Sequence, residues 1–211
     1  WSSDVCSSDL CGLLGAFVQA TSGGALYRKS SFLVDSLGQR VFAAHISMIE
    51  DPHVPGAMGS APFDEEGVRT VRREVVKQGV VEGYFLSTYS ARKLGMKTTG
   101  NAGGSHNLAL RSSQTTARDD FRAMLRKLGT GLLVTELMGQ GVNYVSGDYS
   151  RGACGFWVEN GVIVHPVEEI TIAGNLREMF KNIVAVGADT IVRGTKETGS
   201  ILIDGMTIAG A

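Results

Sequence analysis

The sequence predicts a strand-rich α+β domain whose sheets are twisted, mostly antiparallel and half-barrel-like, with a few short helices. Three observations lead to this fold class. Short apolar runs flank the dipeptide Asn160-Gly161, apolar residues recur with a period of two around Gln78-Gly79, and the 28 glycines are spread along the chain. Glycine and asparagine at such points are typical of tight turns between strands.

The Asn160-Gly161 pair predicts a two-residue type I′ turn, because both central residues of that turn need positive φ. A two-residue turn fixes the register of the hairpin. We expect the pairs, counted outward from the turn, to be Glu159 with Val162, Val158 with Ile163, Trp157 with Val164 and Phe156 with His165. Apolar side chains then fall on both faces, so we expect an internal strand that is covered on both sides.

The elements before this hairpin are read in chain order. Residues 1–10 contain a near-duplicated Ser-Ser-Asp unit and no period, so we interpret residues 1–11 as an artefactual leader and residues 12–211 as the domain. Helical spacing of apolar residues predicts a buried helix over 12–20, ended by 21–24, and then a helical or irregular piece over 27–36. Period two from residue 46 to 50 predicts a strand, the runs around Gln78-Gly79 predict a hairpin, and 51–66, with three of the four prolines, predicts a long surface loop.

The remaining elements follow from caps and periods. We expect one helical turn over 89–94, a polar loop over 97–107 and an amphipathic helix over 119–128 that Gly129 and Gly131 end. A strand starts at Leu132. After the central hairpin we expect a helix over 174–182 with Asn175 as N-cap, and short strands over 183–186, 200–203 and 206–208.

Composition limits the function. Lys+Arg number 20 against 21 Asp+Glu, so no basic excess supports nucleic-acid or membrane binding. No apolar run approaches the roughly 20 residues of a spanning helix. Three cysteines without metal-knuckle spacing favour a reducing cytoplasm.

The residues offer only weak catalytic candidates. The four histidines His45, His53, His106 and His165 are isolated, without the i, i+4 spacing of a zinc helix. Cys154 and His165 are expected as diagonal neighbours that could form a thiol dyad, although a strand cysteine more often serves as a small hydrophobe. Two glycine-rich loops, 100–106 and 139–147, could hold an anion or simply form turns. Arg151 could bind a carboxylate, whereas Asp148 is expected to hold its own turn.

Four long blocks of the sequence carry a resemblance to a known family. They are GGALYRKSSFLVDSLGQ, EGYFLSTYSARKLGMKTTGNAGGSHN, GTGLLVTELMGQGVNYVSGDYSRGACGFWVENG and PVEEITIAGNL. Together they resemble the C-terminal domain of the PmbA/TldE subfamily of the TldD/PmbA peptidases. The family protein is about twice as long as this chain, so the resemblance implies a fragment without the family's N-terminal α/β domain.

The resemblance implies a cytoplasmic, heterodimeric metallopeptidase that processes or degrades unfolded peptides. In that family a TldD-like partner carries zinc on two His and a Glu of one helix and on a distant Cys. The equivalent positions here are about Leu14 to Gln19 and Thr198, which supply no such ligands. The resemblance therefore implies a component of a peptidase with no catalytic residue, metal ligand or cofactor of its own, a zinc-carrying TldD-like partner, and neither nucleic acid nor membrane as partner.

We expect the glycine-rich loops, taken as 97–106 and 139–148, to face the substrate chamber or the partner subunit. The candidate residues are Gly103, His106, Gly139, Gly141, Gly147, Asp148 and Arg151. Two alternatives stay open: a self-sufficient cysteine hydrolase that uses Cys154 and His165, and a regulatory module that binds another protein.

Overall fold

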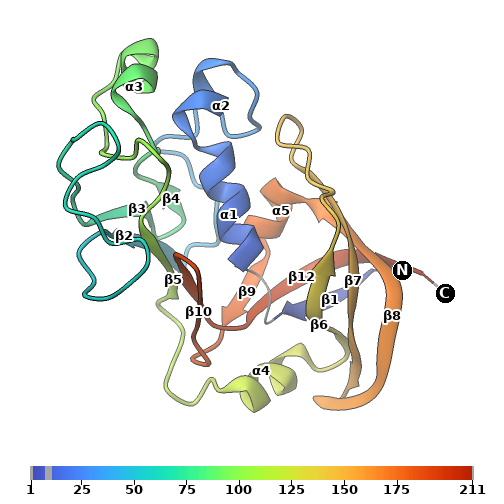
Figure 1. Ribbon diagram of the computed structural model, residues 1–211. Helices are drawn as coiled ribbons and strands as arrows, with labels where there is room; N and C mark the ends of the chain where they lie inside the picture. Colours follow the sequence, from blue (N-terminus) through green and yellow to red (C-terminus); the bar gives the residue numbers. More distant parts are fainter. Residues whose placement is uncertain (1, 8–10, 211) are drawn as a thin grey trace. The chain divides into compact units, whose positions relative to one another are not determined.

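The structure is a computed structural model of the 211-residue chain that describes residues 2–7 and 11–210 (Figure 1). The described residues divide into two compact units. Unit 1 holds residues 2–7, 112–191 and 198–210, and unit 2 holds residues 11–111 and 192–197. Each unit has one sheet with short helices, so the predicted α+β class with curled, mostly antiparallel sheets is confirmed.

Unit 2 contains a six-stranded sheet and three helices. The strand order is β10-β11-β5-β2-β3-β4. The elements are α1 (Cys11–Ala20), α2 (Gly23–Tyr27), β2 (Ile46–Asp51), β3 (Arg73–Lys77), β4 (Val80–Val81), α3 (Thr88–Leu94), β5 (Asn107–Ser112), β10 (Ile191–Arg193) and β11 (Lys196–Thr198). The core of this unit includes α1, where the buried Phe17 ring meets Phe42 edge to face at 5.2 Å and Phe85 at 6.3 Å.

In unit 2 the strand and hairpin predictions that depend on residues near one another in the sequence are correct. The hairpin at Gln78-Gly79 and the alternation of β2 are confirmed, and the loop over 51–66 contains no helix or strand after Asp51. The predicted end of the first helix at residues 21–24 is wrong in part. Gly23 begins α2, because the Ser22 side chain caps a new helix by accepting a hydrogen bond from the backbone N–H of Ala25.

Unit 1 contains the second six-stranded sheet, in the order β1-β6-β7-β8-β12-β9. Its elements are β1 (Ser2–Ser7), α4 (Phe121–Leu128), β6 (Gly131–Met138), β7 (Asp148–Glu159), β8 (Val162–Asn175), α5 (Leu176–Lys181), β9 (Ile183–Val186) and β12 (Ile201–Ala209). Because β1 pairs with both β6 and β12, the strands β1, β6, β7, β8 and β12 close into a ring, and β9 continues the sheet from β12.

The central hairpin forms as predicted at its turn and departs from the prediction farther out. Asn160 and Gly161 have φ of 51° and 76°, and Glu159 pairs with Val162 and Val158 with Ile163. The next predicted pairs are wrong: Trp157 faces His165 and Phe156 faces Pro166, because a bulge leaves one extra residue on β8.

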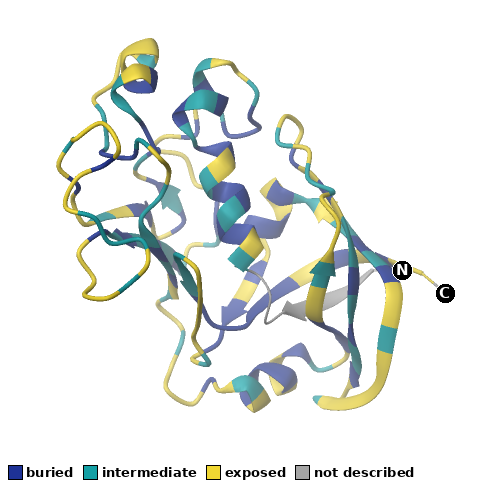
Figure 2. Cartoon of the chain, in the orientation of Figure 1, coloured by how far each residue is buried: buried dark blue, intermediate teal, exposed yellow. Residues whose placement is uncertain are grey.

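Both strands of this hairpin are internal in the strand order, as predicted, but neither is buried on both faces along its length. β7 lies between β6 and β8. β8 is not covered on both sides, because its first half is an exposed band in which Val162 is 63% and Val164 53% accessible (Figure 2).

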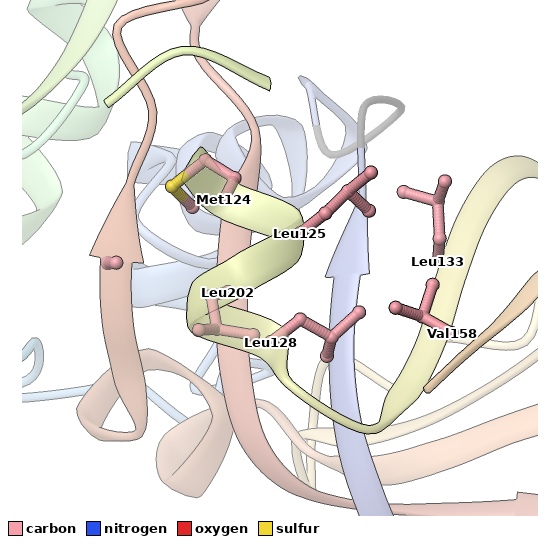
Figure 3. Packing of buried hydrophobic residues seen from close by; sticks show 7 residues of the cluster. Met124, Leu125, Leu128, Leu133, Val158 and Leu202 are labelled. Atoms are coloured by element: carbon pink, nitrogen blue, oxygen red, sulfur yellow. The ribbon is translucent and has the colours of Figure 1, made fainter. Parts of the chain in front are cut away.

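Helix α4 closes one side of unit 1. Asp120 caps it by accepting from the backbone N–H of Ala123. Leu125 and Leu128 point toward Leu133 and Val158 of the sheet (Figure 3), and Met124 and Leu202 belong to the same buried cluster. Beside the cap, Asp119 accepts a hydrogen bond from Lys127, and this bond together with the Thr116 backbone N–H lowers the pKa of Asp119 to about 2.

The ends of unit 1 bring two further corrections. Ser2–Ser7, expected to lack a regular pattern, forms β1 through backbone pairing; whether the leader is native to the domain stays a prediction. The two predicted strands over 200–203 and 206–208 are one strand, β12. The N-cap Asn175 of α5 and the strand β9 are confirmed. Among the described residues, no helix is long and apolar enough to cross a membrane.

Candidate functional site

The glycine-rich loop 97–106 of unit 2 is fixed by one buried carboxylate. Glu50, 1% exposed, continues the buried face of β2 after Ile46 and Met48. Its oxygens accept from Arg73 Nε at 2.7 Å, from Asn101 Nδ2 at 2.8 Å and from the backbone N–H of His106 at 2.8 Å. Sequence reasoning missed this role of Glu50, although an acidic residue on a strand's buried face was a usable signal.

A second carboxylate holds the same loop from the 51–66 side. Asp64 accepts the backbone N–H groups of Ala102, Val68 and Glu66. Burial of the Asp64 carboxyl opposes ionisation, but these backbone hydrogen bonds outweigh it and lower its pKa. Hydrogen bonds to two carboxylates, those of Glu50 and Asp64, therefore hold the loop in place.

The two predicted residues of this loop differ in setting. Gly103 is exposed and lies against the side chain of Glu65. His106 is half-buried, with Nδ1 3.2 Å from the Gly59 carbonyl and Nε2 2.9 Å from the Gly100 carbonyl. A neutral imidazole has a single N–H, so it can donate to one of these two carbonyls at a time.

The other glycine-rich loop, 139–148, is the tip of the β6–β7 hairpin in unit 1. Ser150 N–H donates to the Gly141 carbonyl at 2.7 Å, and a Cβ on Gly141 would lie 1.5 Å from the Ser150 carbonyl oxygen, so only glycine fits there. Asp148 accepts from the side chains of Ser146 and Asn175, through Oγ and Nδ2, which lowers its pKa. Its expected role in holding its own turn stays a prediction. Gly139 and Gly147 sit at positive φ at either end of the tip.

Arg151 follows the tip on β7, on the strand face that also carries the buried Tyr149 and Ala153. Its Nη2 reaches the Leu137 carbonyl at 3.4 Å, and its buried Nε has no hydrogen-bond partner among the described residues. The seven predicted residues thus divide between the units: Gly103 and His106 lie in unit 2 and the other five lie in unit 1. Whether these loops face a chamber or a partner stays a prediction.

The expected pairing of Cys154 with His165 is wrong. The bulges of β8 place His165 opposite Trp157, whereas Cys154 faces Glu136 on β6. Burial raises the pKa of the Cys154 thiol, and the nearby charges of Glu136 and Glu168 raise it further. A raised pKa keeps the thiol protonated, which favours the interpretation of Cys154 as a small hydrophobe.

Two further histidines contact oxygen atoms of other residues. His53 Nε2 meets Thr70 Oγ1 at 3.1 Å, and His165 Nδ1 lies 3.2 Å from the Pro166 carbonyl. Within the part of the chain that the structure describes, no three His, Cys, Asp or Glu side chains gather where they could hold a metal ion.

Comparison with known proteins decides the family. The model of the PmbA/TldA metallopeptidase C-terminal domain matches residues 5–210. The chain belongs to the PmbA/TldA metallopeptidase family. It is 53% identical over 199 residues to metalloprotease PmbA of Escherichia coli O157:H7, covering 94% of this chain and 43% of that protein. It is 54% identical over 199 residues to a PmbA homolog of Haemophilus influenzae, covering 94% and 44%. The chain thus spans less than half the length of these PmbA relatives.

Solved structures of other proteins share the fold. A proposed modulator of DNA gyrase from Thermotoga maritima superimposes with a TM-score of 0.89 at 33% identity, covering 99% of this chain and 50% of that one. TldE from Thermococcus kodakarensis gives a TM-score of 0.85 at 23% identity, covering 99% and 50%, which is a likeness of fold.

The family name implies a metal, and the described residues of this PmbA-like chain do not fit one. The α1 positions at which the resemblance places zinc ligands are filled by core residues such as Leu14 and Phe17, which are 1% and 0% exposed. Thr198, at the position of the distant cysteine, donates its hydroxyl to the Gly199 carbonyl. No reaction step through a metal is therefore derived for these residues.

Proposed function

We propose that this chain is part of a non-metal-binding, PmbA/TldE-like subunit of a cytoplasmic heterodimeric metallopeptidase that processes or degrades unfolded peptides. In this proposal a TldD-like subunit holds the zinc and the reactive water, and this chain forms part of the chamber wall. One observation carries the proposal: α1 packs in the core of unit 2 through Leu14 and Phe17, at positions where a zinc-carrying relative would need histidine and glutamate.

The sheets support the peptide side of the proposal. β10 and β4 end the sheet of unit 2, and all three residues of β10 are exposed. An exposed strand edge can pair with an extended peptide through backbone hydrogen bonds, which carry little sequence preference. Such binding suits a peptidase that acts on unfolded chains.

The test compares the chain alone with a mixture that contains a zinc-loaded TldD-like subunit. We expect no bound zinc and no cleavage of an unfolded fluorogenic peptide with the chain alone, and cleavage in the mixture. A mixture whose TldD-like subunit has been stripped with a chelator serves as the control and should be inactive. Zinc bound by the isolated chain through its own side chains would overturn the proposal.

The same measurements address the two alternatives. The cysteine hydrolase loses support because Cys154 has a raised pKa and lies away from His165. Peptide cleavage by the isolated chain that iodoacetamide abolishes would revive it. A regulatory module would instead bind another protein without any peptide cleavage in the mixture.

A further inference from the structure

A cavity of about 320 Å³ opens on one face of the unit 2 sheet. Ile49 and Asp51 of β2, Asn107, Ala109 and Arg111 of β5, and Glu197 of β11 line it along the strands. Val54 and Ala57 of the 51–66 loop close one side, and Val192 of β10 lies on the other. In Figure 1 the strands β2 and β5 lie side by side, and in the strand order β11 lies between β5 and β10.

The polar side chains of the cavity are already satisfied within the protein. Asn107 donates to the Asp51 carbonyl and Ser60 Oγ and accepts from Gly59 N–H. Arg72 Nε pairs with Asp51 Oδ2 at 3.2 Å, and Arg111 Nη2 pairs with Glu197 Oε1 at 2.5 Å.

Lys196 also borders the cavity, but its Nζ donates to Thr195 Oγ1 at 2.9 Å and to Ser105 Oγ at 3.3 Å. Its strand neighbour is the buried Leu108, which places its side chain on the buried face of the sheet. The charges on the cavity face therefore cancel as two ion pairs, and a charged ligand would have to break one of them.

The apolar part of the lining is aliphatic and partly accessible. Val54 is 39% and Val192 64% exposed, and none of the described residues around the cavity is aromatic. A ligand gains free energy here by burying aliphatic surface and finds no ring on which a nucleobase could stack. The volume lies at the low end of the range for ligand sites, about 300 to 1,000 Å³.

We propose that this cavity binds one branched aliphatic side chain, such as leucine, of an extended unfolded peptide. That the bound side chain belongs to a peptide rests on the proposed function, whereas the selectivity for an aliphatic side chain rests on the cavity alone. Balanced charges around an aliphatic floor select for an uncharged side chain and tolerate varied flanking residues. This site would give a processing enzyme for unfolded peptides a preference at one position.

The test measures binding to the 211-residue chain without a partner subunit. Two fluorescent octapeptides, blocked at both ends and otherwise glycine and serine, carry either leucine or serine at the centre. We expect the leucine peptide to bind at least about tenfold more tightly, as burial of one leucine side chain predicts. Equal affinities of the two peptides would overturn the proposal.

Two variants locate the binding. Ala109→Leu fills the cavity from its sheet floor and should abolish the preference for the leucine peptide, whereas Ala44→Leu, on an exposed residue outside the lining, should leave it unchanged. A preference that survives in Ala109→Leu would overturn the site. The uncharged 1-decanol serves as a free aliphatic probe, and binding of 1-decanol without discrimination between the peptides would overturn the peptide as ligand.

The outcome is separable from that of the proposed function. If the two-subunit mixture cleaves no peptide but the chain binds the leucine peptide more tightly than the serine peptide, the proposed peptidase role is rejected and the binding site is kept. If the mixture cleaves peptide but the chain binds the leucine and serine peptides equally, the binding site is rejected and the proposed peptidase role is kept.

Discussion

At the scale of single residues, Glu50 is the buried charged residue of unit 2 whose loss we expect to cost the most stability. It is buried, and it joins β2, Arg73 and the 97–106 loop through three hydrogen bonds. Removing one member of a buried ion pair leaves the other uncompensated, which costs about 3 to 5 kcal/mol. Because the Arg73 side chain keeps 17% exposure, we expect Glu50→Gln to lower the free energy of unfolding by the lower end of that range, measured by urea denaturation.

A neighbouring carboxylate provides the control. Glu74 pairs with Lys77 at 3.4 Å on the surface, with both side chains well exposed, so Glu74→Gln should cost less than about 1 kcal/mol. Hydrogen exchange gives a local readout, because the His106 amide donates to Glu50 and should exchange faster only in Glu50→Gln. Similar losses of stability in the two variants would contradict the role assigned to Glu50.

At the scale of elements, the Asn160-Gly161 turn sets the register of the β7–β8 hairpin. Gly161 has φ of 76°, and a Cβ there would lie 3.0 Å from Arg126 Cα. Left-handed backbone costs an alanine about 1 to 2 kcal/mol, and crowding against Arg126 adds to it. Gly161→Ala should therefore destabilise the chain more than Gly205→Ala, where φ is 74° and the space is open. Equal urea midpoints for the two variants would show that the crowding has no effect.

The β7–β8 hairpin also shows which features could be predicted from the sequence and which could not. Asn160-Gly161, Gln78-Gly79 and the N-cap Asn175 act through residues within a few positions, so their elements were predictable. The bulges of β8 were not, because they depend on how β8 follows the curvature of the closed ring. The β8 shift in turn separated Cys154 from His165, so an error of one residue in register removed a candidate catalytic pair.

Long-range partners account for the remaining misses. β5 was not predicted, since its partner β11 comes from the last part of the chain, and only the first residue of β5, Asn107, fell in the predicted polar loop. Glu50 looked like an ordinary strand residue until Asn101 and His106 were brought beside it. Of the candidate site, the sequence could indicate which loops are rich in glycine. The hydrogen bonds by which Glu50 and Asp64 hold the 97–106 loop became visible only in three dimensions.

At the scale of the whole molecule, neither unit is a single stretch of chain. Unit 2 consists of residues 11–111 completed by residues 192–197. β11 pairs with β5 in parallel, with Lys196 opposite Leu108, and Leu108 N–H donates to the Thr195 carbonyl at 2.8 Å. A fragment of residues 11–111 would therefore leave the edge of β5 without its native partner, and buried strand edges without hydrogen bonds destabilise a sheet.

We expect residues 11–111 alone to unfold at lower urea concentration than the same fragment joined to residues 192–197. Because β10 and β11 form a hairpin with only two residues between them, β10 runs antiparallel to β5, and Val192 starts near the end of β5, two strands away, or roughly 10 Å. A flexible linker of about twelve Gly and Ser residues spans about 17 to 21 Å on average, so it suffices.

Circular dichroism during urea titration compares the two fragments. In a third fragment Lys196 and Glu197 are replaced by proline, which cannot donate to the β5 ladder, so its midpoint should fall back to that of residues 11–111. If all three fragments unfold at one midpoint, β11 contributes nothing to unit 2 and the discontinuous unit is not a unit of stability.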